Sequence, residues 1–164
     1  MKMSTILTFC TALLLPAIMF PIGVSGRPAS EQGAAADFKD VAGREWILSE
    51  VRAGGKTVTM DRVKLVADNF GGVYTITFSE GQAAGMGAPN RYHGPYTLGS
   101  GDAISLGNVA STMMLAFREP DGLSEREYFD YLGRITRWNL RSGTLELYSR
   151  DSAGSEAILV FSQK

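Results

Sequence analysis

Residues 71–85, GGVYTITFSEGQAAG, contain the most regular strand pattern in the chain. Two sets of side chains alternate strictly, and β-branched and aromatic residues dominate, as they do in the strands of folded proteins. Because alternate residues of a strand point to opposite faces, this pattern predicts a β-strand at 73–78. One face carries Val73, Thr75 and Thr77, and the other carries Tyr74, Ile76 and Phe78.

Further extended runs lie on both sides of this strand, separated by short turns that contain glycine. The turn sequences GSGD, RSG and DSAG are typical of hairpin connections, which join antiparallel strands. A meander of antiparallel strands is therefore expected near the carboxyl end. The additional predicted strands span residues 45–51, 92–98, 103–106, 135–140, 144–149 and 156–162.

Residues 123–135, LSEREYFDYLGRI, have the pattern of a helix. Ser124 and Glu127 have the spacing of a capping box, in which each side chain bonds to the backbone N–H of the other residue. Gly133 is expected to end or kink this helix. A single helical turn is also compatible with the residues that follow Asp37. The apolar positions at helical spacing are Tyr128, Leu132 and Ile135.

These elements predict an α+β domain: a β-rich antiparallel sheet, or a partly open barrel, of about seven or eight strands packed with one main α-helix. The 164 residues suit one domain, and 45% hydrophobic with 20% charged residues is ordinary for a globular core. Residues 37–164 are expected to form the domain. Residues 27–36, RPASEQGAAA, are small and polar and are expected to form a flexible leader.

The N-terminal residues have the composition of a cleavable export signal. An uncharged, apolar stretch separates Lys2 from Arg27 and ends in small residues. We expect residues 1–26 to be a signal peptide that is cut after Gly26, with a second possible site at residues 29–30. The mature protein is therefore expected to be periplasmic or secreted.

An uncleaved membrane anchor is the alternative interpretation, because the apolar stretch is almost long enough to span a bilayer. Pro16 and Pro21 favour cleavage, since both interrupt a long helix. Cys10 lies inside the apolar run and not at its end, so a lipoprotein is not expected. Cys10 is the only cysteine. Its removal with the signal would leave no disulfide, no thiolate metal site and no cysteine nucleophile.

Charge and motif content argue against several classes of function. The 16 Lys and Arg residues nearly balance the 17 Asp and Glu residues, so a nucleic-acid partner is not expected. His93 is the only histidine and no Gly-x-Ser-x-Gly motif accompanies it, so we expect neither a metal site nor a serine nucleophile. The glycines at 85 and 87 begin a dinucleotide pattern, but Asn90 stands where the third glycine belongs and a strand follows. No cofactor is expected.

The order of the motifs resembles the META domain family over residues 41–161. The resemblance rests on a turn from Gly87 to Asn90, an aromatic–x–glycine–x–tyrosine strand, a Thr-Met segment and a helix that ends in YLGRI. This family includes heat-inducible HslJ-like proteins and META-type proteins linked to virulence. It implies a β-rich fold around a helix, without known enzymatic activity or cofactor. The residues of the family signature and possible binding face are Gly87, Asn90, Arg91, Tyr92, Gly94, Tyr96, Thr112, Met113 and Met114.

The turn before the second signature strand has two expected properties. Gly85 and Gly87 are expected to adopt backbone angles closed to other residues, and Asn90 to cap the turn with its side chain. The chain also departs from the family here, because members often carry a cysteine at the position of Pro89 and another at that of Ala116. If these positions are neighbours, an apolar contact replaces the cysteine pair and removes any redox role.

The resemblance and the residues together predict a non-enzymatic binding or interaction module related to envelope stress or virulence. Its partner is expected to be an envelope protein, a peptide or a lipid chain. The hypothesis depends on Met113, Met114, Leu115 and Phe117, because adaptable methionines beside an aromatic residue suit grooves for variable apolar ligands. From the sequence we favour the other interpretation of these residues, as core side chains under the helix.

Two alternative functions stay open. A small structural or inhibitory envelope protein would act through exposed tyrosines and arginines. A weak acid–base enzyme would use His93 with a neighbouring tyrosine or acid. His93 is expected on the opposite face of its strand from Tyr92 and Tyr96, and that tyrosine face is either core or the floor of a groove. The arginines of the structural alternative are Arg118, Arg126 and Arg137.

Overall fold

The computed structural model describes residues 37–116 and 118–164. The expected signal peptide at 1–26 and leader at 27–36 lie outside the described residues. Among the helices of the described part, none is long and apolar enough to cross a membrane.

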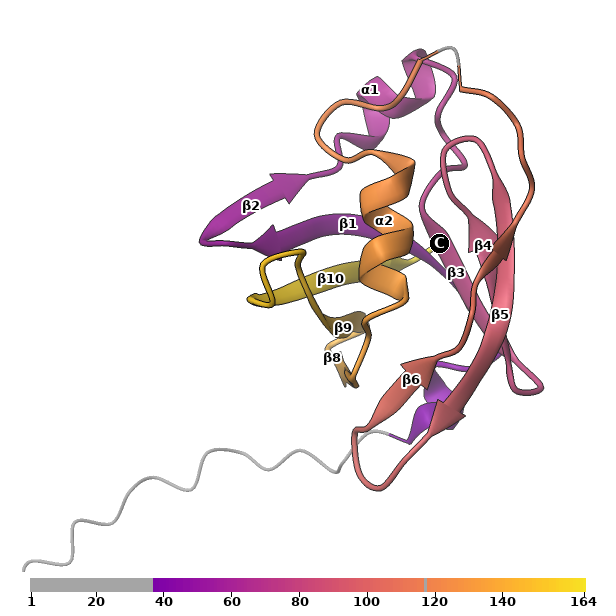
Figure 1. The fold of residues 1–164 in the computed structure, drawn as a ribbon, viewed down its shortest axis with the longest axis vertical. Coiled ribbons are helices and arrows are strands. Elements are labelled where there is room, and N and C mark those ends of the chain that lie inside the picture. The colour runs from indigo at the N-terminus through magenta and orange to yellow at the C-terminus, as the bar shows by residue number, and fades with distance from the viewer. Residues whose placement is uncertain (1–36, 117) are drawn as a thin grey trace, which may run out of the picture. The chain divides into compact units, whose positions relative to one another are not determined.

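The described residues form ten strands, paired antiparallel in one strongly curved sheet (Figure 1). Eight strands follow the order β6-β5-β4-β3-β1-β10-β9-β8, while β2 pairs with β1 and β7 pairs with β5. The predicted C-terminal meander is confirmed, and its last strand lies against the first strand of the domain. The strands are β1 (Glu45–Ala53), β2 (Lys56–Thr59), β3 (Thr75–Ser79), β4 (Gln82–Met86), β5 (Arg91–Leu98), β6 (Ile104–Leu106), β7 (Ala110–Ser111), β8 (Arg137–Arg141), β9 (Thr144–Arg150) and β10 (Glu156–Gln163).

The two end strands of the sheet, β6 and β8, come together and nearly close a barrel of eight strands. An isolated bridge joins Ala103 to Arg137, and the Trp138 N–H donates a hydrogen bond of 2.9 Å to the Asp102 carbonyl. This seam is shorter than the strand pairs elsewhere in the barrel. The arrangement confirms the expected α+β class with a β-rich barrel and one main helix.

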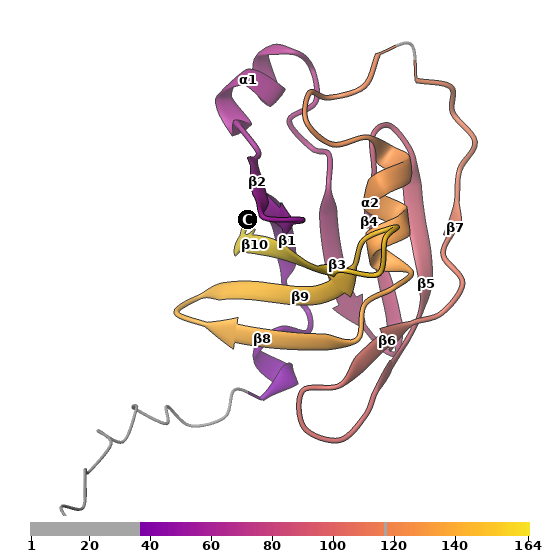
Figure 2. The same cartoon turned by 60° about the vertical axis from the view of Figure 1, so that its left-hand side comes forward.

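The main helix, α2 (Glu125–Leu132), lies on the concave side of the sheet (Figures 1 and 2). The predicted capping box is present: the Ser124 side chain accepts from the Glu127 N–H, and the Glu127 carboxylate accepts from the Ser124 N–H. Gly133 is the C-cap, as expected. Tyr128 and Leu132 are fully buried, so this short helix is held by its apolar face.

A group of tyrosine hydroxyls forms the polar centre of the core. Tyr92 and Tyr128 both donate to the carbonyl oxygen of Thr75, at 2.8 and 3.1 Å, and their hydroxyl oxygens are 3.1 Å apart. The hydroxyl of Tyr74 donates to the Leu123 carbonyl. Because each hydroxyl donates to a backbone carbonyl, the barrel can bury three phenols without losing their hydrogen bonds.

Several elements differ from those expected. The strand predicted at 73–78 begins at Thr75, because Tyr74 has a positive φ of 57°. Strands β2, β4 and β7 were not predicted, since none of them has the apolar alternation that marked the other strands. A second helix, α1 (Arg62–Ala67), was also missed, and Asp61 caps its N-terminus. The expected single turn near Asp37 is present as a 3₁₀ helix, η1 (Phe38–Asp40).

Candidate functional site

The signature asparagine and an acidic residue of α2 form the centre of the candidate site. Asn90 is buried directly before β5, and Glu125 is the first residue of α2. Glu125 Oε1 accepts hydrogen bonds of 2.6 Å from the backbone N–H groups of Ala88 and Asn90, and its Oε2 accepts one of 2.7 Å from Asn90 Nδ2. Hydrogen bonds to a charged acceptor are stronger than neutral ones, so this carboxylate fastens the turn to the helix.

The same asparagine fixes the segment that follows β7. Asn90 Oδ1 accepts hydrogen bonds from the Thr112 hydroxyl and from the Met114 N–H, both at 2.7 Å. Its Nδ2 also donates to the Met114 carbonyl at 3.1 Å. Figure 2 shows this segment running beside β5 before it turns toward α2. The expectation that the Asn90 side chain caps its own turn was wrong, because all of its hydrogen bonds go to Glu125, Thr112 and Met114. The side chain joins three parts of the chain instead.

The glycines at 85 and 87 allow close packing and not unusual backbone angles. The expectation of backbone angles closed to other residues was wrong, because neither glycine has a positive φ. A Cβ atom on Gly87 would lie 2.5 Å from Glu125 Oε1, and one on Gly85 would lie 1.9 Å from the Thr75 carbonyl oxygen. The missing side chain of Gly87 thus leaves room for the carboxylate. The Ala88–Pro89 peptide bond in this turn is cis.

The three apolar residues that follow Thr112 project into solvent. They are Met113, Met114 and Leu115, and we call them the Met113–Leu115 loop. They are 98%, 61% and 88% exposed, respectively. The interpretation of these residues as core under the helix is therefore wrong: the space beneath α2 is filled by buried aromatic and leucine side chains instead. Phe117, the last residue of that hypothesis, lies outside the described residues.

The tyrosine face of β5 belongs to the core. Tyr92 is 3% exposed, and the Tyr96 ring lies 5.2 Å from the Phe78 ring, centre to centre. Gly94 between them is buried, and a Cβ atom there would lie 3.0 Å from the carbonyl oxygen of Asn108, so another part of the chain does approach closely. The question whether this face is core or groove is settled for Tyr92 in favour of core.

The remaining candidate side chains lie on the surface. Arg91 and His93 alternate with the buried positions of β5 and are exposed, as is Arg126 on α2. Arg137 is occupied by neighbours, because its guanidinium lies 4.2 Å from the centre of the Tyr148 ring and pairs with two carboxylates. These residues do not converge with Asn90 on one site.

The hydrogen bonds around Asn90 and Glu125 hold separate parts of the chain together. The Glu125 carboxylate already accepts three hydrogen bonds. Burial raises the pKa of both Tyr92 and Tyr128, so these hydroxyls stay protonated at neutral pH and donate to backbone. In the part of the chain that the structure describes, no three His, Cys, Asp or Glu side chains are grouped so as to hold a metal ion.

Glu125 is the site residue that the sequence did not reveal. Glu127 forms the expected capping box with Ser124, whereas Glu125, which belongs to no local motif, turns toward the 87–90 turn. The partner of Glu125 is 35 residues away in sequence, and no local pattern links an asparagine to an acid at such a distance. The one physical signal for such a residue is that the backbone N–H groups of a buried turn need an acceptor, here those of Ala88 and Asn90.

We call the hydrogen-bonded residues Asn90, Thr112, Met114 and Glu125 the asparagine-centred cluster. The fold and this cluster define a small β-barrel domain with one inner helix and an exposed apolar loop that is tied to Asn90 through Met114. The META domain family matches residues 39–164, and the chain belongs to this family. It is not a known enzyme family. No curated protein matches the sequence.

Two solved structures have the same fold. The NMR structure of a protein from Burkholderia xenovorans is 23% identical, with a TM-score of 0.57 over 83% of this chain and 96% of that one. The crystal structure of a DUF4847 family protein from Bacteroides vulgatus is 13% identical, with a TM-score of 0.50 over 76% of this chain and 95% of that one. At these identities the likeness concerns the fold alone.

Proposed function

We propose that this protein is a non-enzymatic binding module of the cell envelope that inserts its Met113–Leu115 loop into an apolar groove of a partner protein. The proposal rests on one observation: the side chains of this loop are exposed, while the backbone of its middle residue is held by hydrogen bonds. The three side chains are 61–98% exposed, yet the buried Asn90 side chain holds both the N–H and the carbonyl group of Met114. A contiguous exposed apolar patch is typical of an interaction site.

The fixed backbone supports binding more than mere exposure does. Because the backbone of Met114 is already held by Asn90, the loop loses less conformational entropy when a partner binds it, so more of the contact energy becomes affinity. Methionine side chains are flexible and polarisable, which suits apolar surfaces of varied shape. The sequence predicted a groove in this protein that would receive an apolar ligand. Because these residues protrude from the domain, they would instead enter a cavity of the partner.

Export is part of this proposal. Residues 1–26 have the composition of a signal peptide, and a periplasmic or secreted protein would meet partners related to envelope stress or virulence. N-terminal sequencing of the exported protein should find a mature chain that begins near Arg27. A chain that keeps Met1 and stays in the membrane fraction would contradict this part.

The loop is tested with paired variants of the full chain. A photo-crosslinking residue at position 113 identifies the partner in native envelope, and direct binding is then measured with the purified partner. We expect Met113→Ser with Leu115→Ser to weaken binding at least about tenfold, since each substitution removes about 1–2 kcal/mol of apolar contact. The matched control is Val63→Ser with Val66→Ser, because these residues are also exposed, 83% and 63%, but lie on α1.

Two results would overturn the proposal. One is equal affinity of the loop variant and the control variant for the purified partner. The other is loop-dependent binding to protein-free phospholipid vesicles without any crosslinked protein, which would identify the loop as a lipid-inserting segment.

A further inference from the structure

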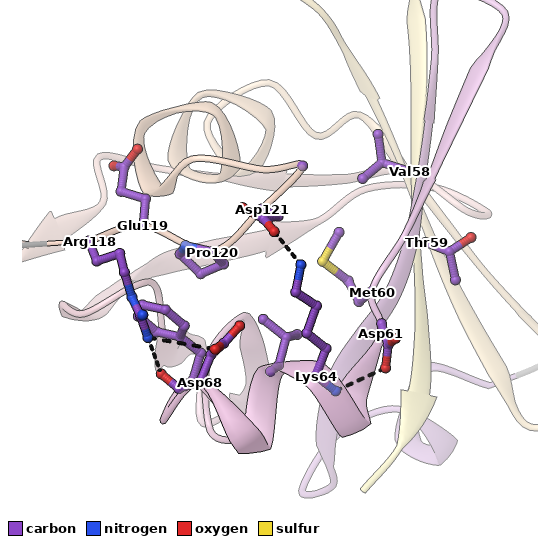
Figure 3. Close-up of a pocket in the computed structure, with 13 residues that line it drawn as sticks. Val58, Thr59, Met60, Asp61, Lys64, Asp68, Arg118, Glu119, Pro120 and Asp121 are labelled. Atoms are coloured by element: carbon purple, nitrogen blue, oxygen red, sulfur yellow. Dashed lines mark hydrogen bonds and ion pairs between the residues drawn. The ribbon is translucent and has the colours of Figure 1, made fainter.

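A cavity of about 460 Å³, whose lining includes no residue of the asparagine-centred cluster, lies between β2, α1 and the segment 118–122 (Figure 3). Its size is within the range of small-ligand sites. Apolar side chains from all three segments form much of its wall, and Met60, Leu65 and Pro120 among them are buried. The apolar lining residues are Val58, Met60, Leu65, Phe70 and Pro120.

The mouth of this cavity carries more acids than bases. Four carboxylates and two cations line it, which gives a formal charge of 2 − 4 = −2. Both cations are engaged in ion pairs that join α1 and its C-cap residue to the segment 118–122, as Figure 3 shows. Lys64 Nζ lies 2.5 Å from Asp121, and Arg118 Nη2 lies 3.8 Å from the Asp68 carboxylate. The remaining carboxylates are those of Asp61 and Glu119.

The charged groups at the mouth are accessible to a ligand. The side chains of Lys64 and Asp121 are 58% and 83% exposed, and exposed ion pairs of this kind contribute little to stability. A ligand cation can therefore take the place of a protein cation beside these carboxylates. A ligand anion would face an excess of negative charge, because each base already has an acid beside it.

An aromatic ring in the wall adds a second element of cation recognition. The guanidinium carbon of Arg118 lies 5.6 Å from the centre of the Phe70 ring, which is within the range of a cation–π contact. The wall thus already accommodates a positive charge next to an apolar surface. A cavity with apolar walls and negative charge at its entrance is complementary to an ammonium or guanidinium group on an apolar chain.

From these observations we propose that the cavity between β2, α1 and the segment 118–122 binds a primary ammonium or guanidinium group on an aliphatic chain. The chain would lie against Met60 and Leu65, and the cation would lie between Asp68 and Asp121 at the mouth. A free alkylamine and a lysine side chain of a polypeptide share this chemistry. The lining of this cavity includes no residue of the Met113–Leu115 loop, so this proposal does not rest on the function proposed for the loop.

Three probes of equal chain length test the proposal on the full chain: hexylammonium, hexanol and hexanoate. Binding is followed by the methyl NMR resonance of Met60, which lies in the wall. We expect saturable shifts with hexylammonium, with a Kd of about 1 mM, as is reasonable for so few heavy atoms. Hexanol and hexanoate should bind several-fold more weakly. N-acetyl-lysine methylamide, used as a fourth probe, distinguishes a peptide side chain from a free amine by which of the two binds tighter.

Charge variants at the mouth should act in opposite directions. Asp121→Asn removes a carboxylate and releases Lys64, so hexylammonium should bind about three- to fivefold more weakly. Lys64→Gln removes the competing cation, so the same probe should bind more tightly. Asp40→Asn, in the distant η1, is the control and should leave the Kd unchanged. Val58→Trp should fill the cavity and reduce binding of every probe.

The proposal is overturned if hexanoate or hexanol binds as tightly as hexylammonium, or if none of the probes gives a saturable shift of Met60. It is also overturned if the Asp121 and Lys64 variants change the Kd in the same direction. Both variants concern exposed side chains, so their folding can be verified by the dispersion of the other methyl resonances. Failure of this site would leave the loop experiment unaffected, since the two tests use different residues and different ligands.

Discussion

Asn90 and Glu125 hold each other through both the backbone and the side chain of the asparagine. Glu125 Oε1 accepts from the Asn90 N–H at 2.6 Å, and Glu125 Oε2 accepts from Asn90 Nδ2 at 2.7 Å. The other atom of the amide, Asn90 Oδ1, is left to accept from Thr112 and Met114. One residue pair therefore sets the position of the helix start relative to the exposed loop.

Glu125→Gln should lower the free energy of unfolding by about 1–3 kcal/mol, the range for hydrogen bonds to a charged group. Glutamine has a single acceptor oxygen, and its amide N–H groups would face the N–H donors of the 87–90 turn. Urea unfolding followed by tryptophan fluorescence measures the change. Asp130→Asn, at an exposed position of the same helix, should stay within about 0.5 kcal/mol of the wild type. Equal stability of the two variants would contradict the role given to Glu125.

Gly85→Ala should destabilise the protein by about 3 kcal/mol or more, because the added Cβ would lie 1.9 Å from the backbone carbonyl oxygen of Thr75. A backbone atom cannot move aside as a flexible side chain can. Gly72→Ala is the matched control, since its Cβ would have no atom within 4 Å and its φ is not positive. We expect the control to be neutral or slightly stabilising. Similar thermal midpoints for the two variants would rule out the close approach between β3 and β4.

The buried tyrosines predict a loss of stability at high pH. Burial raises the pKa of Tyr128 and of Tyr92 above the value of about 10 expected in the unfolded chain. The unfolded state therefore releases these protons first, and stability that is complete below about pH 10 falls as the pH rises toward the folded pKa values. Urea unfolding at a series of alkaline pH values should show a shallower decline for Tyr128→Phe than for the wild type. Parallel declines would mean that the hydroxyl of Tyr128 does not contribute to the titration.

The capping box predicts a change at low pH. Hydrogen bonds from Ser124 lower the pKa of Glu127, so the contribution of this carboxylate is present above its unfolded pKa of about 4.5 and is lost as the pH falls through the folded pKa. At neutral pH, Ser124→Ala should cost about 0.5–2 kcal/mol. This difference from the wild type should shrink in acid, although the bond from the Glu127 N–H to Ser124 persists. A difference that stays constant down to acid pH would show that the ionised form of Glu127 is not involved.

Local patterns predicted the parts of the fold that have local causes. The alternation around Ile76 and the spacing of Ser124 and Glu127 each contain their own reason for being a strand or a capped helix. Strand β4 was not predicted because QAAGM has few β-branched or large apolar residues, and it is a strand only because β3 and β5 lie on either side of it. Its pairing partners, and not its own side chains, determine its conformation.

The candidate site was only partly predictable for a related reason. Asn90, Thr112 and Met114 were expected, and the structure brings them together, but Glu125 joins them through contacts that cross 35 residues of sequence. The exposure of Met113 and Leu115 could not be derived from composition, because the same apolar residue types occur in protein cores and in binding surfaces. What distinguishes the two here is the hydrogen bonding of a neighbouring backbone, which depends on the completed fold.

The seam between β6 and β8 has a consequence for the motions of the barrel. Its strands are the two ends of the sheet order, and an isolated bridge with a few flanking hydrogen bonds joins them. Local opening of a protein begins where the fewest bonds must break. The Trp138 and Ile104 amide protons, which donate across this seam, should therefore exchange with deuterated solvent before those between β1 and β10. The barrel would then open locally between β6 and β8, while the pairing of β1 with β10 stays intact.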